Sequence, residues 1–260
     1  MAIKYYVIDA FADSVFKGNP AGVCIVDKEL DDITMQNIAA ENNLSETAFV
    51  TKHDGYYGLR WFTPTVEVNL CGHATLASAF VITNFVDTNA TQMEFKTKSG
   101  LLTVKKKADL YELNFPSNKP KQVEATTKMQ DAIGVSVLEA YAVPKILVLL
   151  VDNEEQVKNI VPDLNLIGKL SDDAVIVTAK GDSVDFVSRF FAPNIGITED
   201  PVTGSAHTIL APLWSEKLLK DEMVAKQVSK RGGTLFCRDC GDRVKIAGKG
   251  VLYLEGEIVV

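Results

Sequence analysis

A short sequence pattern occurs once in each half of this 260-residue chain. Residues 60–68 read RWFTPTVEV and residues 189–197 read RFFAPNIGI, so that arginine, phenylalanine and proline match at identical offsets, as do Val66 with Ile195 and Val68 with Ile197. A glycine then opens an apolar segment in each half, CGHATLASAF and TGSAHTILAPLW. Internal repetition is the signature of a repeated architecture. It predicts an α+β fold with two pseudo-symmetric halves, each a β-sheet around a buried helix.

Hydrophobic periodicity places the elements within these halves. The β-branched and aromatic runs KYYVIDAF and AGVCIVD predict a hairpin, and strands are expected at ETAFVTK, YYGLRWFTP, QMEFKTK, LLTVKKK and DLYELNF. DDITMQNIAAENN predicts a helix capped by Asp31 or Asp32, and CGHATLASAFVITNF predicts a buried helix. YAVPKILVLLV is expected to be one buried strand, and PSNKPKQVEATT a linker. The halves are placed at residues 1–117 and 118–260, and the last strand can pack on the first half.

Composition excludes several classes of protein. With 47% hydrophobic and 23% charged residues the chain is typical of globular proteins, and its net charge of -7 disfavours nucleic acids and anionic membranes as partners. The N-terminus has no signal-peptide pattern, and no apolar run approaches a bilayer span. We therefore expect a cytoplasmic protein with no nucleic-acid partner and no membrane partner.

The four cysteines favour reduced thiols because they are few for this length and nothing indicates secretion. Cys237 and Cys240 form a CRDC motif, which raises the question of zinc. A structural zinc site needs four nitrogen or sulfur ligands, and the chain has no second CxxC motif and only three histidines. The motif is interpreted as a turn with two thiols, and no metal is expected.

The glycines that open the two apolar segments predict anion sites. A strand that leads through a glycine into a helix presents free backbone N–H groups and the positive end of the helix dipole. Gly72 and His73 would form the first site, and Gly204 and Ser205 the second. If the two halves face each other, both sites line one cleft, and the expected ligand is a small carboxylate. The alternative is that both glycines only permit tight turns.

Four motifs carry a family resemblance: FADSVFKGNPAGV, NLSETAFV, RWFTPTVEVNLCGHAT and FFAPNIGITEDPVTGSA. In this order, from Phe11 to Ala206, they closely resemble the PhzF-like family of phenazine biosynthesis, a branch of the diaminopimelate epimerase-like fold. The resemblance implies two pseudo-symmetric halves with mixed, curved sheets, an active site between them, and a homodimer. It also implies cofactor-independent proton transfer next to a substrate carboxylate.

The resemblance also assigns residues. In the member that gave the family its name, a glutamate in the NLSET-like motif moves a proton within a cyclohexadiene carboxylate, and Glu46 occupies that position here. The family's polar companions of the glutamate map to His73 in CGHAT and Asp200 in EDPVTGS. We therefore predict an isomerase of a small, cyclic carboxylic acid with Glu46, His73 and Asp200 as catalytic residues. Gly72, Gly204 and Ser205 would bind the carboxylate, and no cofactor is implied.

Elementary electrostatics adds expectations for these side chains. Among Leu44, Ala48 and Val50, burial is expected to raise the pKa of Glu46 toward neutrality. At a helix N-terminus the neutral form of His73 is favoured, and the alternative role for His73 is a hydrogen bond to the backbone of a turn. Asp200 can instead cap the following helix, and His207 is expected to pack in the interior or face solvent.

Two other functions stay open at this stage. In the two-cysteine racemases of the same fold, a cysteine precedes glycine at both helix starts, whereas this chain has Cys71 before Gly72 but Thr203 before Gly204. That pair resembles the hydroxyproline dehydratase branch, so a Cys71 and Thr203 enzyme is an alternative. A non-catalytic carboxylate-binding or interaction protein is another. The chain has no GxSxG, P-loop or GxGxxG motif, so no motif supports an esterase, a nucleotide hydrolase or a nicotinamide-dependent oxidoreductase.

Overall fold

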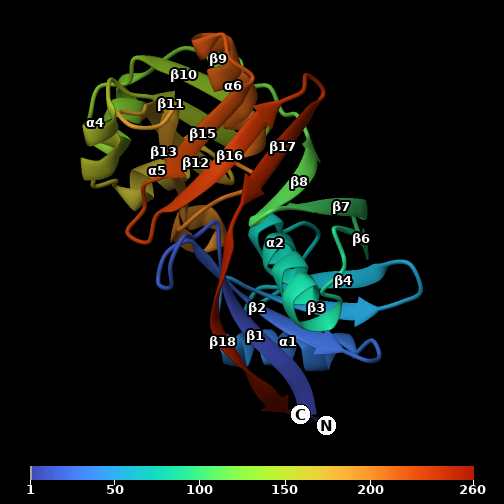
Figure 1. Cartoon of the computed structure of the whole chain (residues 1–260). Helices are drawn as coiled ribbons and strands as arrows, with labels where there is room; N and C mark the ends of the chain where they lie inside the picture. The colour runs from blue at the N-terminus through green and yellow to red at the C-terminus, as the bar shows by residue number, and fades with distance from the viewer. Residues whose placement is uncertain (1) are drawn as a thin grey trace. The chain divides into compact units, whose positions relative to one another are not determined.

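The structure is a computed structural model, and it describes residues 2–260. Internal contacts divide the chain into two compact units (Figure 1). Unit 1 consists of Met1–Asn114 with Ala247–Val260, and unit 2 of Phe115–Ile246. The boundary therefore falls near the end of β8 (Leu110–Pro116), and the last strand belongs to the first unit.

Unit 1 contains a mixed sheet and two helices. The strands are β1 (Ala2–Ala10), β2 (Asn19–Val26), β3 (Glu46–Lys52), β4 (Tyr57–Phe62), β5 (Glu67–Val68), β6 (Gln92–Thr97), β7 (Gly100–Lys107), β8 and β18 (Gly250–Val259). The helices are α1 (Asp32–Asn42) and α2 (Gly72–Val81), and α2 continues into the π-helical turn η1 (Ile82–Val86). The predicted hairpin is confirmed, because β1 pairs antiparallel with β2 from Lys4↔Ile25 to Ala10↔Asn19.

The two helices of unit 1 lie on different faces of its sheet. Asp31 caps α1 as predicted, since its Oδ1 accepts the Thr34 N–H at 2.9 Å, and Asn43 ends the helix in a left-handed conformation. Met35 and Ile38 of α1 pack in one cluster with Phe49 of β3. Helix α2 contacts β1, β2 and β3 and is buried along nearly its whole length, as its all-round apolar sequence predicts (Figure 1).

Unit 2 repeats the strand pairing of unit 1. Its strands are β9 (Lys121–Val123), β10 (Glu139–Val143), β11 (Ile146–Leu150), β12 (Ala174–Lys180), β13 (Phe186–Ala192), β14 (Ile197–Asp200), β15 (Glu222–Gln227), β16 (Gly233–Asp239) and β17 (Arg243–Gly248). Strands β10 to β13 pair antiparallel, parallel and antiparallel in turn, as β1 to β4 do. β13 then pairs antiparallel with β14 and parallel with β15, as β4 does with β5 and β6. The predicted α+β fold with two pseudo-symmetric halves is confirmed.

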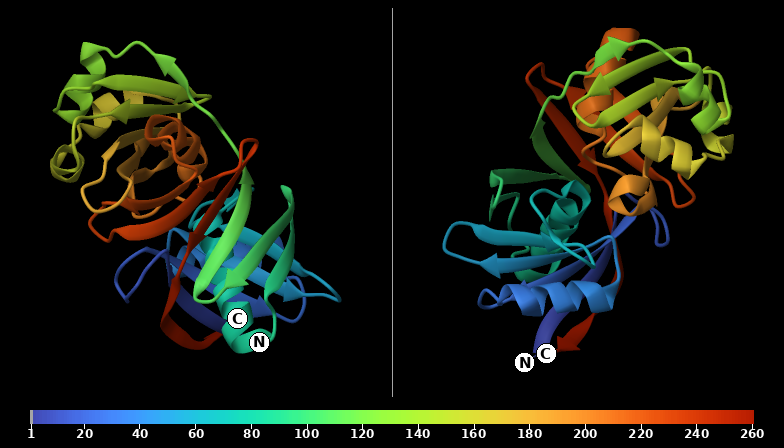
Figure 2. Two further views of the ribbon diagram at one scale, coloured as in Figure 1. Left: turned by 45° about the horizontal axis from the view of Figure 1, so that its top comes forward. Right: turned by 180° about the vertical axis from the view of Figure 1, so that it is seen from behind.

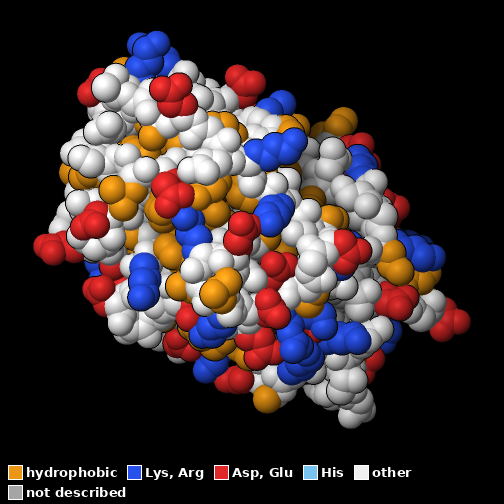
Figure 3. Space-filling model, turned by 90° about the horizontal axis from the view of Figure 1, so that it is seen from above, with side chains coloured by type: hydrophobic (Ala, Val, Ile, Leu, Met, Phe, Trp, Pro, Cys, Tyr) orange, Lys and Arg blue, Asp and Glu red, His pale blue; other side chains and the backbone are white. Residues whose placement is uncertain are grey.

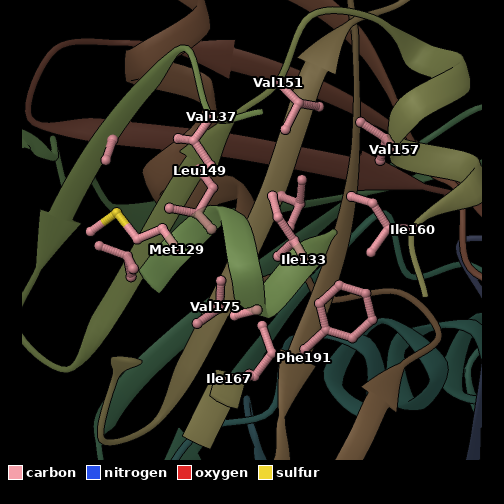
Figure 4. Packing of buried hydrophobic residues seen from close by; sticks show 14 of the residues in the cluster. Met129, Ile133, Val137, Leu149, Val151, Val157, Ile160, Ile167, Val175 and Phe191 are labelled. Atoms are coloured by element: carbon pink, nitrogen blue, oxygen red, sulfur yellow. The ribbon is translucent and has the colours of Figure 1, made fainter. Parts of the chain in front are cut away.

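The helices of unit 2 are α3 (Thr127–Ile133), α4 (Glu154–Asn159), α5 (Leu164–Leu170), η2 (Pro193–Ile195) and α6 (His207–Leu218). Helix α6 follows the second copy of the repeated pattern, as α2 follows the first, and it is also mostly buried. A hydrophobic core joins α3, α4 and α5 to strands β10 to β13. Figure 4 shows Met129 and Ile133 of α3 beside Leu149 and Val175 of the sheet.

Two predicted segments differ in the structure. YAVPKILVLLV is not one strand, because Pro144 and Lys145 form a turn between β10 and β11 and Lys145 has a φ of 66°. Proline has no N–H for a sheet ladder, so a break there is favoured. PSNKPKQVEATT is not a linker throughout, because its residues 121–123 form β9 and pair with β10.

The two ends of the described chain belong to the same unit. β18 runs antiparallel to β1 from Ala2↔Val259 to Ala10↔Gly250, and Figure 2 shows both ends together in both views.

None of the helices in residues 2–260 is long and apolar enough to span a bilayer. On the face drawn in Figure 3, basic and acidic side chains are interspersed, without a large area of one sign.

Candidate active site

Glu46 is the first residue of β3, and the strand's alternation decides which way it faces. Phe49 points toward α1, where it joins the cluster of Met35. Residues of even number therefore lie on the opposite face, toward α2. Glu46 is only partly buried, with 15% of its side chain exposed, but its Oε2 atom is fully buried. The exposed part of the side chain thus consists of its other atoms.

His73, the second residue of α2, lies between two partners. Its Nε2 is 3.2 Å from Oε2 of Glu46, and its Nδ1 is 3.5 Å from Sγ of Cys71. The Nε2–Oε2 contact is close enough for an ion pair, although the two atoms are not aligned as a hydrogen bond. The structure therefore brings together two of the predicted catalytic residues. It adds Cys71 as a third member. The His73 ring contacts these two side chains and not the backbone of a turn, so the alternative role is not observed.

The charges in this group differ from the sequence expectation. Burial raises the pKa of Glu46, but His73, chiefly through its positive charge, and the adjacent Cys71 thiol together lower it more, so its pKa lies below the ordinary value. For His73, burial lowers the pKa, whereas Cys71 and Glu46 raise it, and the result is well above the ordinary value. Both expected directions were wrong, because each group has an opposite charge beside it that the local sequence does not reveal. Both directions favour a carboxylate at Glu46 and a protonated ring at His73.

Cys71 keeps its proton in this environment. Burial raises the pKa of its thiol first of all, and the negative charge of Glu46 raises it further, while His73 acts in the opposite direction. The thiol is therefore the prevailing form at neutral pH, whereas the thiolate is the form that abstracts protons or binds metals.

Glu46, Cys71 and His73 each offer a possible metal ligand, and these ligand atoms lie within 4.8 Å of one another. A metal ion needs one ring nitrogen of the histidine, with its lone pair directed at the ion. Here Nδ1 faces the sulfur and Nε2 faces the carboxylate, so neither nitrogen faces both other ligands. The ring thus contacts the sulfur through one nitrogen and the carboxylate through the other, and the sulfur itself lies within 4.8 Å of the carboxylate.

The corresponding region of unit 2 is a polar network around Thr203. The Thr203 hydroxyl donates to Oδ2 of Asp200, and Gln227 accepts the Thr203 N–H at 2.8 Å. The Gln227 amide donates to the Asp200 carbonyl at 2.7 Å and to the Thr203 hydroxyl oxygen at 3.2 Å. Asp200 does not cap α6, whose N-cap is Ala206 and has no side-chain cap. It lies at the end of β14, with its side chain bonded to Thr203.

Strand register shows which residues of the two units correspond. Trp61 pairs with Val68 in unit 1, and its counterpart Phe190 pairs with Asp200 in unit 2. The equal-offset match of Val68 with Ile197 is therefore wrong, because unit 2 has an insertion of three residues that forms η2. The corrected register still matches Cys71 with Thr203, since Cys71 comes three residues after Val68 and Thr203 three residues after Asp200.

Three further correspondences follow from this register. His73 matches Ser205, and Thr75 matches His207. The Thr75 hydroxyl and His207 Nδ1 each contact the carbonyl four residues earlier, at 2.6 Å and 2.8 Å. His207 is fully buried, and burial lowers its pKa to about 4, so it is a packing residue. Glu46 matches Ala174, because Thr47 pairs with Phe62 and Val175 pairs with the counterpart of that residue, Phe191.

The repeated arginines serve the same purpose in both units. Arg60 forms two bonds to Glu67, each 2.8 Å long, and Arg189 forms two to Glu199, at 2.7 Å and 2.9 Å. Each arginine joins the long strand to the short strand that leads toward the helix start. The repeat therefore holds the two helix starts in place, although its arginines lie outside the candidate site.

The start of α2 has the local structure that an anion site requires, whereas Gly204 and Ser205 lie in the turn before α6, whose N-cap is Ala206. No side chain caps α2, so the N–H groups at Gly72 and His73 are not used by a cap. Neither Gly72 nor Gly204 is among the glycines with positive φ, so a left-handed turn does not explain them. Ser205 is exposed.

A cavity of about 440 Å³ lies within unit 2, and another of about 600 Å³ lies within unit 1. None of the predicted site residues lines either cavity.

Sequence reasoning missed two contacts. Cys71 and His73 are separated by one residue at a helix start, and this spacing was a usable signal for their contact. Gln227 comes far after Thr203 in the chain and has no motif around it, so no local signal pointed to it. The prediction that Gly72 and Gly204 serve one substrate stays a prediction.

Comparisons with known proteins agree with this fold. The sequence signature of the phenazine biosynthesis-like protein family, PhzC-PhzF, matches residues 8–256. An uncharacterized isomerase of Pseudomonas aeruginosa is 46% identical over 258 residues, which cover 99% of each chain. A crystal structure of a PhzF-family phenazine biosynthesis protein from Enterococcus faecalis is 47% identical and covers 100% of both chains, with a TM-score of 0.98.

A more distant structure shows how widely the fold is shared. A hydroxyproline epimerase from Agrobacterium vitis is 9% identical, with a TM-score of 0.65 over 99% of this chain and 92% of the other. That likeness concerns the fold alone. The family match and the two close relatives extend over nearly the whole sequence, and the chain therefore belongs to the phenazine biosynthesis-like, or PhzC-PhzF, family.

Proposed function

We propose that the protein is a cofactor-independent isomerase that moves a proton within a small, cyclic carboxylic acid. Glu46 takes the proton from one carbon and returns it to another. The observation that carries the proposal is the buried contact between Oε2 of Glu46 and Nε2 of His73. The name of the relative from Pseudomonas aeruginosa, an uncharacterized isomerase, supports the same reaction class.

Glu46 is suited to accept a proton because His73 keeps it ionised at neutral pH. Oε2 faces the imidazolium, which leaves the other carboxylate oxygen for the substrate. A general base must lie within hydrogen-bond reach of the proton that it removes. Because one carboxylate both removes and returns the proton, the two reacting carbons would present the same face of the substrate to Glu46.

His73 would stabilise the intermediate by its charge. Removal of a proton next to a carboxylate places negative charge on the substrate, and a fixed positive charge nearby lowers the energy of that state. Only 7% of the His73 side chain is exposed, so little water screens its charge.

The substrate carboxylate would bind at the start of a helix. The N–H groups of Gly72 and His73 are uncapped, and Gly204 and the exposed Ser205 hydroxyl offer the corresponding groups of unit 2. Asp200 and Thr203 would orient the second helix start. We further propose that the protein works as a cytoplasmic homodimer without a cofactor.

The thiol alternative has less support. A Cys71 and Thr203 mechanism needs a thiolate at one position and a free hydroxyl at the other. Burial favours the neutral thiol of Cys71, and the hydroxyl hydrogen of Thr203 is committed to Asp200 while Gln227 donates to its oxygen. Ala174 also occupies the place of Glu46 in unit 2, which leaves a single buried carboxylate and histidine pair.

The test is solvent exchange. The protein is incubated in deuterated water with a panel of cyclic and α-substituted carboxylic acids, and the loss of C–H signals is followed by NMR. Glu46→Gln should abolish exchange on any active substrate. Cys71→Ser separates the two mechanisms, because a hydroxyl can keep the contact with His73 but cannot replace a thiolate at neutral pH. Thermal stabilisation by ligands without exchange across the panel would instead support a binding protein.

A further inference from the structure

Cys71 occupies a fixed position beside His73. Its carbonyl accepts bonds from the Thr75 N–H at 3.1 Å and from the Thr75 hydroxyl at 2.6 Å, so the backbone at Cys71 is tied to the first turn of α2. Its side chain does not cap the helix. The sulfur instead contacts Nδ1 of His73, and both residues are buried.

This contact is made at Nδ1, whereas Glu46 lies at Nε2, and the sulfur is itself within 4.8 Å of the Glu46 carboxylate. The two nitrogens of an imidazole flank one ring carbon, and a partner at one of them fixes which way the other points. With the sulfur at Nδ1, Nε2 must face the carboxylate of Glu46. If the sulfur were removed, a buried ring N–H would lose its acceptor, and the ring would no longer be held in this orientation.

The internal repeat provides a comparison within the same chain. At the corresponding positions, unit 2 has Thr203 for Cys71, Ser205 for His73 and Ala174 for Glu46. The Thr203 side chain there bonds to Asp200 and not to the residue two positions later. Thiol, imidazole and carboxylate therefore occur together in unit 1 and are all replaced in unit 2. This is the pattern expected if the three side chains act as one group.

We propose that Cys71 is a positioning residue for His73. The His73 Nδ1–H donates to the sulfur, and this contact holds Nε2 toward Glu46 and stabilises the imidazolium. The catalytic consequence rests on the proposed function, but the orientation and charge of the ring do not require a substrate. Among the ionisable groups on the elements packed around α2, Glu46 acts on His73 by its charge, and Cys71, which keeps its proton, acts through the contact at Nδ1.

The histidine ring can be observed directly. The chain has three histidines, so protein labelled with nitrogen-15 histidine gives few ring signals in a long-range proton–nitrogen spectrum. His73 is assigned by its loss in His73→Gln. In the wild type we expect both ring nitrogens of His73 to be protonated above pH 6.5. In Cys71→Ala the pH midpoint of the His73 titration should fall by about one pH unit, the equivalent of one hydrogen bond. Cys71→Ser should bring the midpoint most of the way back to the wild-type value.

The matched control is Cys24→Ala. Cys24 is also a fully buried thiol of unit 1, but it packs in the cluster of α1. Its removal should leave the ring signals of His73 unchanged. If Cys71→Ala does not fold, Cys71→Val leaves no cavity and also removes the sulfur contact. Ring shifts and a midpoint in Cys71→Ala or Cys71→Val that equal those of the wild type would overturn the proposal.

Activity provides the second readout. On an active substrate, Cys71→Ala should slow exchange about tenfold, the effect of one hydrogen bond, with little change in KM, and Cys71→Ser should recover it. If no substrate exchanges with the wild type, the proposed function fails, while the ring titration still decides the role of Cys71. An unchanged titration together with active exchange would refute the positioning role and leave the isomerase intact.

Discussion

At the scale of single residues, the charge on Glu46 is the feature with the widest consequences. A carboxyl buried among apolar groups would titrate near neutral pH, whereas a carboxyl beside an imidazolium stays ionised to lower pH. Glu46 belongs to the second class because His73 is 3.2 Å away. The proposed base is therefore already ionised at neutral pH and can accept a proton directly.

The pH dependence of exchange follows from these two groups. The pKa of folded Glu46 lies below 4.5, so the carboxylate is lost only as pH falls through that lower value. The pKa of His73 lies well above 6.5, so the imidazolium is lost only as pH rises past that higher value. We predict a plateau of kcat/KM that includes the range from pH 4.5 to 6.5 and extends above it. An acid limb centred near pH 6 in an exchange assay would contradict this charge state.

The same pair links stability to pH. A lowered pKa of Glu46 contributes stability above the unfolded pKa, and this is lost as pH falls through the folded value. A raised pKa of His73 contributes stability below its unfolded pKa, and this is lost as pH rises through the folded value. The contribution of the ion pair is therefore largest between 4.5 and 6.5.

At the scale of elements, the start of α6 depends on one buried side chain. Gln227 at the end of β15 is 1% exposed and forms three hydrogen bonds, to Asp200 and Thr203. It thereby joins the end of β14 to the turn before α6. A substitution of Gln227 therefore tests how the helix start is held.

We predict that Gln227→Leu destabilises unit 2 by about 3 kcal/mol, since three hydrogen bonds of about 1 kcal/mol each are lost. Urea denaturation followed by tryptophan fluorescence gives the value, because Trp214 lies in α6. Gln122→Leu is the control, as Gln122 is an exposed glutamine of β9. Equal midpoints for the two variants would show that the Gln227 bonds add no net stability.

Sequence patterns predicted much of the fold and part of the site. The repeat predicted two similar halves, and the apolar segments predicted α2 and its burial. The repeat could not reveal the insertion at η2, because Pro193, the first residue of η2, matches Pro64 of the first copy. Motifs identified Glu46 and His73, but the charge of each depends on the other, and they are far apart in the chain. The direction of their pKa shifts therefore required the structure.

At the scale of the whole molecule, the chain does not divide into two contiguous pieces. β18 returns to unit 1 and covers one side of β1, whose other side pairs with β2 (Figure 2). The folding of unit 1 therefore requires the last residues of the chain. Unit 2 is contiguous in sequence, from Phe115 to Ile246.

Removal of residues 250–260 should weaken unit 1 selectively. β1 would become an edge strand with unpaired backbone groups, and we predict loss of amide hydrogen-exchange protection in β1 while β12 and β13 stay protected. Mass spectrometry of exchanged peptides measures both regions in one sample. Deletion of Val260 alone is the control, since that residue lies outside β18. Equal loss of protection in both units would mean that they unfold together.

The most direct test of the central claim is the exchange rate constant of Glu46→Gln on an active carboxylic acid. Glutamine keeps the size of the side chain but cannot take up the proton, so we predict a loss of at least about 10²-fold, the usual contribution of a general base. Glu41→Gln, which removes the same charge from an exposed position of α1, should exchange at the wild-type rate. A folded Glu46→Gln protein that exchanges as fast as Glu41→Gln would contradict the role of Glu46 as the proton carrier.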